Sequence, residues 1–371
     1  MNKKFWATTF TLTGTIIGAG ILGLPAVFAK SGFLAGLFWL IVLGAVMIFV
    51  NLSLGEITLR TRGKHQLSGY AEKYLGAWGK RAMFFSVIFG VYSALLAYLI
   101  GEGESLSKII PGNTPPIIFG IIFWIIMTLL LTRGLKGLKR VETWGVTIII
   151  LIVIGIFIRF AQFIEPANLM TWNQTSFTLP IGVVLFALLG FTSIPELRQE
   201  IKGQEKLLKK AIILGTIIPI ILYIIFSSIF IGVLGTNITQ IATLSFGPLM
   251  TFLGIFTMLT SYFVLSFSLK NTFKYDIGTS KKTNFLLTSI LPLIIYIIVT
   301  QFEFIGFTLI LGIGGVISGG STGILALLML KRAKDNTRNN KKPEIQIPIN
   351  WTLIAILSII FILGIILEFS H

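Results

Sequence analysis

The sequence predicts an all-α integral membrane protein with eleven membrane-spanning helices. Hydrophobic residues make up 54% of the 371 positions and charged residues only 12%, which leaves too little polar surface for a soluble domain. A bilayer core of about 30 Å needs about 20 apolar residues per spanning helix, and such runs recur along the whole chain. The predicted spans, in order, cover residues 7–29, 33–59, 82–107, 115–132, 141–163, 177–197, 211–234, 246–269, 284–301, 304–330 and 351–369.

The distribution of positive charge predicts how these spans are oriented. The net charge is +16, and with an inner N-terminus 27 of the 30 Lys and Arg residues fall in the inner segments. The outer segments hold only Lys30, Lys108 and Arg159. This asymmetry is typical of a multi-pass protein of the cell membrane, and it predicts a cytoplasmic N-terminus and an extracytoplasmic C-terminus. The basic charge therefore indicates orientation in a lipid bilayer and no nucleic-acid partner.

Several classes of chemistry are excluded by what the sequence lacks. The chain has no cysteine, and its two histidines, His65 and His371, lie outside the apolar runs. Paired intramembrane acids, an H-E-x-x-H motif and a glycine-rich phosphate loop are also missing. We therefore expect neither an enzyme nor a resident cofactor or metal. The first apolar run is too long for the hydrophobic region of a cleaved signal peptide, so we expect an uncleaved span.

The first span contains a stretch that opposes helix formation. Residues 18–25 read GAGILGLP, and each interior glycine costs about 1 kcal/mol relative to alanine. Pro25 also removes a backbone donor. A broken helix is tolerated at membrane depth only where protein buries it or where it lines a cavity. We therefore predict a discontinuous first span, with Pro25 restarting its outer half.

A second stretch repeats this pattern. Residues 190–195 read GFTSIP and match GILGLP at residues 20–25 in the order glycine, apolar, any residue, small, aliphatic, proline. The first copy lies in span 1 and the second in span 6, so the two segments have opposite orientations. Matched interruptions in two halves of a membrane protein indicate a transporter substrate site. Free amides at one half-helix suit a carboxylate, and free carbonyls at the other suit a cation, so two facing breaks suit a zwitterionic amino acid.

These residues carry a family resemblance. TLTGTIIGAGILGLPAVFAKSG, HQLSGYAEKYLG and LFALLGFTSIPELRQEIKG resemble the amino acid/polyamine/organocation superfamily, and most closely its aromatic and neutral amino acid permeases related to the amino acid/auxin permeases. The resemblance extends over roughly residues 7–330. It implies the LeuT-type fold of five plus five inverted helices, with spans 1 and 6 discontinuous. It also implies a secondary transporter that imports a neutral or aromatic amino acid by alternating access.

The resemblance implies roles for individual residues by position. Amides at the first break would face the substrate carboxylate, carbonyls at the second would face its amine, and a tyrosine on span 3 would add a hydroxyl. Close helix packing is the competing explanation for the glycines, and a buried, hydrogen-bonded phenol is the competing explanation for the tyrosine. The implied substrate-site residues are Gly18, Ala19 and Gly20, then Gly190, Phe191, Thr192 and Ser193, and either Tyr92 or Tyr98.

The coupling ion stays open between Na⁺ and H⁺. The resemblance implies a sodium site formed by carbonyls of Gly14 and Ile17 with the hydroxyls of Thr260 and Ser261, although those hydroxyls could simply join helices. A proton site needs an intramembrane carboxyl, which is costly and functional by default. Glu196 directly follows the second break and is the predicted candidate. The other acids near span ends are Glu56, Glu102, Glu104 and Glu303.

The chain is expected to divide into two repeats and a tail. Residues 1–165 form the first five-helix repeat, residues 166–330 the second, and residues 331–371 a cytoplasmic linker with the eleventh span. Residues 331–348 are predicted to be a flexible linker, and residues 60–81 a short amphipathic helix at the inner interface. A ligand-sensing membrane protein or channel of the same fold, such as a germinant-receptor subunit, is the alternative function. The sequence does not indicate an oligomeric state.

Overall fold

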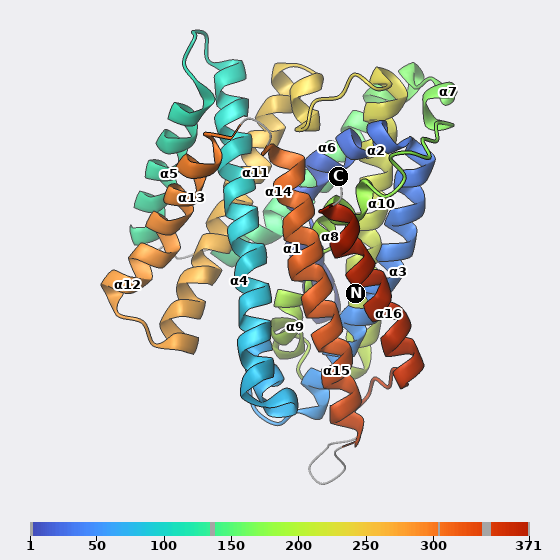
Figure 1. Ribbon diagram of the computed structural model, residues 1–371, viewed down its shortest axis with the longest axis vertical. Coiled ribbons are helices and arrows are strands. Elements are labelled where there is room, and N and C mark those ends of the chain that lie inside the picture. The colour runs from blue at the N-terminus through green and yellow to red at the C-terminus, as the bar shows by residue number, and fades with distance from the viewer. Residues whose placement is uncertain (1–2, 134–137, 303–304, 336–342, 370–371) are drawn as a thin grey trace.

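The structure, a computed structural model, describes residues 3–133, 138–302, 305–335 and 343–369, and every regular element in them is helical (Figure 1). The helices of the bundle are α1 (Lys3–Ile16), α2 (Gly20–Ser31), α3 (Phe33–Arg60), α4 (Leu67–Ile109), α5 (Pro116–Arg133), α6 (Leu138–Phe160), α8 (Pro180–Ala187), α9 (Ile194–Glu200), α10 (Leu208–Leu234), α11 (Pro248–Asn271), α13 (Leu291–Val299), α14 (Phe307–Gly314), α15 (Ser321–Asp335) and α16 (Trp351–Glu368). Shorter elements connect or extend them: η1 (Ala161–Phe163), α7 (Pro166–Leu169), η2 (Phe191–Ser193), η3 (Glu205–Leu207), η4 (Ala242–Ser245), η5 (Thr272–Ile277), α12 (Lys281–Phe285), η6 (Leu286–Ile290) and η7 (Gly315–Gly320).

The helices have the length and composition of membrane spans. In the described part of the chain, eight helices are long and apolar enough to cross a bilayer, and the bent pair α1–α2 makes a ninth. Two further apolar stretches are shorter over their described residues: Pro116–Thr132 in α5, and Thr147–Phe163 in α6 and η1. Large apolar side chains point outward on several helices, as at Ile158 and Leu249, which are 74% and 77% exposed. An apolar outer surface of this kind suits lipid and confirms the integral membrane class.

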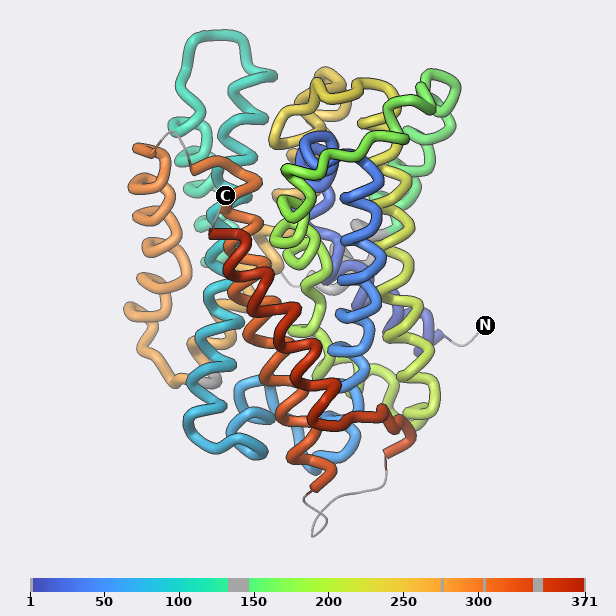
Figure 2. The backbone as a smooth tube through the Cα atoms, turned by 45° about the vertical axis from the view of Figure 1, so that its right-hand side comes forward, coloured from blue at the N-terminus to red at the C-terminus, as the bar shows by residue number. Residues whose placement is uncertain are grey.

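The long helix α4 contains the predicted interfacial helix as its first part. It starts at Leu67, but Gly76 has φ +76° and separates a short helical piece from the span that follows. That piece buries Tyr70 and exposes Glu72, so it is amphipathic as expected. Figure 2 shows α4 continuing through the whole height of the bundle beside α15.

The prediction of a flexible linker over residues 331–348 is wrong at both ends of that range. Helix α15 continues to Asp335, and residues 343–350 lie against the bundle with Ile345 and Ile347 only 1% and 4% exposed. Residues 336–342 lie outside the described residues. The physical reason is the alternation of apolar and polar side chains in PEIQIP, which buries one side of an extended segment.

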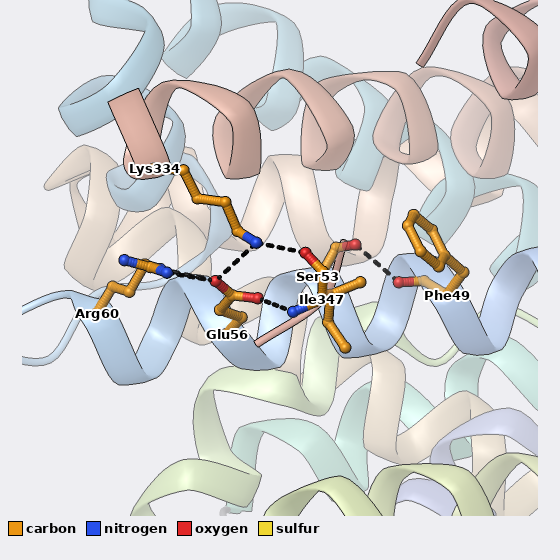
Figure 3. Close-up of polar contacts among 6 residues, drawn as sticks. All are labelled: Phe49, Ser53, Glu56, Arg60, Lys334 and Ile347. Carbon is orange, nitrogen blue, oxygen red and sulfur yellow. Dashed lines mark hydrogen bonds and ion pairs between the residues drawn. The ribbon is translucent and has the colours of Figure 1, made fainter. Parts of the chain in front are cut away.

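A buried carboxylate fixes this segment to the bundle (Figure 3). Glu56 on α3 is fully buried, and its Oε1 accepts from Arg60 Nε at 2.8 Å and lies 3.5 Å from Lys334 Nζ on α15. Its Oε2 accepts from the backbone N–H of Ile347 at 2.5 Å. Lys334 also donates to the carbonyl of Ile347. One side chain therefore joins α3, α15 and the segment that leads into α16.

We predict that Glu56→Gln lowers the free energy of unfolding by about 2–3 kcal/mol, because two cations lose a buried partner. The measurement is the unfolding midpoint of the detergent-solubilised protein. Asp335→Asn is the matched control, because it breaks an exposed pair with Lys331 on the same helix α15 and should cost less than about 0.5 kcal/mol. Equal effects of the two changes would contradict a fixing role for Glu56.

Candidate functional site

The first predicted span is broken, as the glycines indicated. Helix α1 ends at Ile16 and α2 begins at Gly20, and the two are bent by 55°. The N-cap residue of α2, Ala19, makes no side-chain cap. In the first turn, the amide of Leu22 donates to the carbonyl of Ala19 at 3.0 Å, whereas the amides before it have no acceptor one turn earlier in the helix. The prediction that Pro25 restarts the outer half of the span is wrong, because Pro25 lies inside α2, which starts five residues earlier, at Gly20. The glycines alone are enough to end α1.

The second predicted break is also present. Helix α8 ends at Ala187, and the chain passes through Gly190 and the short turn η2 before α9 begins at Ile194. The hydroxyl of Ser193 donates to the carbonyl of Gly190 at 2.9 Å. Both interrupted spans were therefore located correctly from the pattern of glycine and proline.

The two broken helices lie side by side in opposite directions. Helix α1 packs against α9, and α2 packs against α8. Gly20 sits so close to α8 that an added Cβ would lie 2.4 Å from the Cα of Ala187. Only glycine allows this approach. The amide end of α2 therefore lies directly against the carbonyl end of α8.

Tyr98 on α4 contacts the first break. Its hydroxyl accepts from the backbone N–H of Ala19 at 3.2 Å and hydrogen-bonds the side chain of Ser261 on α11. An added Cβ at Gly18 would lie 2.8 Å from the same hydroxyl. Of the two tyrosines left open by the sequence, Tyr98 is therefore the one beside the break. Tyr92 instead donates to the carbonyl of Leu287 at 2.8 Å.

A second tyrosine, which the sequence analysis missed, joins both breaks. The hydroxyl of Tyr223 on α10 lies 2.9 Å from the carbonyl oxygen of Ile16 and 2.8 Å from that of Ala187. These are the last residues of α1 and α8, and Tyr223 is fully buried. A phenol in an otherwise apolar span was the available signal, because its polar group needs a partner at membrane depth.

A cavity lies between the breaks and α4. It contains about 540 Å³ of empty space, including its open mouth, and the described side chains that line it are uncharged. The hydroxyl-bearing residues Thr15, Thr192 and Ser318 line the cavity. Of these three residues, the sequence analysis predicted only Thr192. The predicted residues that line it are Gly18, Gly20, Tyr98, Phe191 and Thr192, whereas Ala19, Tyr92, Gly190 and Ser193 do not.

The cavity continues toward one end of the bundle. A second hollow shares Val87, Val91, Thr192 and Leu265 with it and extends to Gln66 and Ser68. A third hollow shares Gln66 and Ser68 and opens at the surface around Lys64 and Glu72. The three hollows thus follow one another from the breaks toward the end of the molecule where α4 begins, at the lower edge of Figure 1.

The predicted ion-coupling residues are not all brought together. Gly14 lies within α1 and Ile17 directly after it. Thr260 donates to the carbonyl of Thr257 within its own helix at 3.0 Å, and only Ser261 reaches the break, through Tyr98. Glu196 on α9 has an exposed side chain and does not line the cavity. Glu303 lies outside the described residues.

We predict that Tyr223→Phe loosens both breaks at once, because two helix-terminal carbonyls lose their donor. Hydrogen exchange measured by mass spectrometry should become about 5- to 30-fold faster in residues 13–20 and 184–192, equivalent to about 1–2 kcal/mol. Tyr92→Phe is the control, since it removes a phenol–carbonyl bond of similar length but should speed exchange only near residues 286–290. Faster exchange at one break alone would contradict the bridging role.

Comparison with known proteins agrees with this arrangement. Residues 1–368 match the tryptophan/tyrosine permease family. The chain is 26% identical to tyrosine-specific transport system 1 of Haemophilus influenzae over 64% of its own length and 60% of that protein. It is 25% identical to glutamine transporter 2 of Aliivibrio fischeri, over 79% of its own length and 81% of that protein. It is 30% identical to the serine/threonine exchanger of Bacillus subtilis, over 65% of its own length and 57% of that protein.

The chain thus spans less than two thirds of two of these three relatives, but the family match extends over nearly all of it. The resemblance noted from the two broken spans is thereby confirmed at the level of the family. The protein belongs to the tryptophan/tyrosine permease family, a family of transporters and not of enzymes.

Proposed function

We propose that this protein is a secondary transporter that imports a neutral amino acid, most favourably an aromatic one, across the cell membrane by alternating access. The observation that carries the proposal is the uncharged cavity between two broken helices whose amide and carbonyl ends lie together. The family match and the relatives named for tyrosine and glutamine support an amino acid as the substrate.

Recognition of the substrate backbone falls to the helix ends. The first-turn amides of α2 carry a positive partial charge and suit the α-carboxylate, and carbonyls of the second break suit the α-amine. Because helix ends provide these charges, the cavity needs no ionised side chain. Phe191 and Phe186 line the cavity and provide aromatic faces for an apolar or aromatic substrate side chain.

The five-plus-five inverted fold is part of the proposal. Nine spans and the shorter apolar helices α5 and α6 together give eleven. The antiparallel pairing of α1–α2 with α8–α9 is the relation that an inverted repeat requires between its first members. In this scheme residues 1–165 and 166–330 are the two repeats, and α16 is an added helix.

We also assign the orientation and the state of the transporter. The asymmetry of Lys and Arg places the loop at residues 61–66 inside the cell. Because successive hollows lead from the cavity toward this loop, we assign the inward-facing state to this conformation. Either Na⁺ or H⁺ drives uptake in this scheme.

The transport proposal predicts uptake of labelled tyrosine into proteoliposomes under an imposed sodium or pH gradient. Unlabelled tryptophan, phenylalanine and glutamine should compete, whereas lysine and aspartate should not, because the cavity offers no countercharge. Absence of uptake and of exchange for every amino acid under both gradients would refute the transporter. Binding without either would instead favour a ligand sensor of the same fold.

The orientation can be tested cleanly because the chain has no native cysteine. Lys64→Cys and Asn113→Cys introduce one thiol each at exposed loop positions on opposite ends of the bundle. A membrane-impermeant maleimide should label Asn113→Cys in intact cells, and Lys64→Cys only after permeabilisation. The reverse pattern would show that the chain is inserted the other way.

A further inference from the structure

One buried acid has no partner in the fold. Glu102 on α4 is fully buried, and neither of its carboxylate oxygens has a hydrogen-bond partner among the described residues. The sequence placed it near a span end, but α4 continues for seven residues beyond it, to Ile109, and Glu102 is among its buried residues. A bare carboxylate in such a place is strongly unfavourable unless it is neutralised.

Glu102 is next to the candidate substrate site along α4. It follows Tyr98 by four residues, so the two side chains lie on the same face of the helix, about 6 Å apart along its axis. Tyr98 in turn contacts Ala19 at the first break and Ser261 on α11. The cavity and its mouth lie on the other side of Tyr98. Tyr98 therefore separates Glu102 from the inward-facing space.

Among the described residues, no cation forms an ion pair with Glu102, and neither of its oxygens accepts a hydrogen bond. Glu104 on the same helix is directed to Tyr296. Lys270 donates to the carbonyl of Leu131, and Lys331 pairs with Asp335. The helices packed against α4 carry these titratable or charged residues: Tyr262 and Lys270 on α11, Tyr296 on α13, Lys331, Arg332, Lys334 and Asp335 on α15, and Arg133, the last residue of α5, whose side chain lies outside the described ones.

We propose that Glu102 is the proton-binding residue that couples amino acid uptake to a proton gradient. This inference rests on the proposed transport function and assigns H⁺ as its coupling ion. The carboxylate takes up one proton from water on the outer side and holds it as a neutral acid. It later returns that proton to water on the inner side, and no other bond forms or breaks.

Coupling follows from the burial of Glu102. The helices around Tyr98 and the first break can close over Glu102 only when it is neutral, because the ionised form would need water or a cation beside it. Closure around the substrate therefore requires a bound proton. A transporter that must bind the substrate and the proton before it closes carries the two in the same direction.

The test compares Glu102→Gln with wild type in proteoliposomes, using labelled tyrosine. Glutamine imitates the neutral acid, so exchange of internal for external tyrosine should stay within about twofold of wild type. Accumulation driven by a pH gradient should fall at least tenfold, and tyrosine-linked alkalinisation of the medium should disappear. Glu165→Gln is the matched control, because its exposed carboxyl lies in the loop before α7, outside the cavity, and its loss should leave both readouts unchanged.

The outcomes separate this inference from the transport function. If wild type neither accumulates nor exchanges any amino acid, the transport function fails. If wild type transports but Glu102→Gln still accumulates tyrosine on a pH gradient, or only sodium drives uptake, Glu102 is not the coupling residue. Should Glu102→Gln not fold, Glu102→Asp keeps a carboxyl, and its uptake should stay proton-driven with a shifted pH profile. An unshifted profile would overturn the inference.

Discussion

The structure depends on one constraint: backbone groups freed by a helix break must find partners where no water reaches them. Two spans break at the same depth, so their terminal carbonyls and amides would otherwise be unpaired. Tyr223 satisfies the carbonyls of Ile16 and Ala187 with one hydroxyl, and Tyr98 accepts from Ala19. These two phenols make a pair of interrupted helices compatible with a membrane interior.

This solution determines the chemistry of the cavity. Because helix ends provide partial charges of both signs, a zwitterion can be bound without an ionised side chain. The cavity can then stay apolar except for hydroxyls and an uncharged phenol. Gly20 keeps the opposite ends together, since any side chain there would push α2 away from Ala187. Close packing at Gly20 and the proposed ligand recognition are therefore compatible, because the close approach is what brings the two helix ends together.

Local patterns in the sequence predicted the spans and both breaks, because hydrophobic length and glycine–proline interruptions act within a single helix. They did not predict Tyr223, whose role depends on bringing α1, α8 and α10 together. Nor could they separate Tyr98 from Tyr92, which lie on one helix but face different neighbours. The segment around Ile347 was missed because six alternating residues are a weak signal without the buried carboxylate that holds them.

Two fully buried acids show why burial alone does not identify a functional carboxyl. Glu56 is surrounded by Arg60, Lys334 and a backbone donor, so its charge is compensated and its role is to hold segments together. Glu102 has the same exposure, but neither of its carboxylate oxygens has a hydrogen-bond partner among the residues that the structure describes. A protein gains nothing in stability from an uncompensated acid at that depth, and the sequence could replace it with leucine at no cost to packing. The proposed proton coupling gives this acid, four residues beyond Tyr98 on α4, a role that packing does not, because its charge would change during the transport cycle.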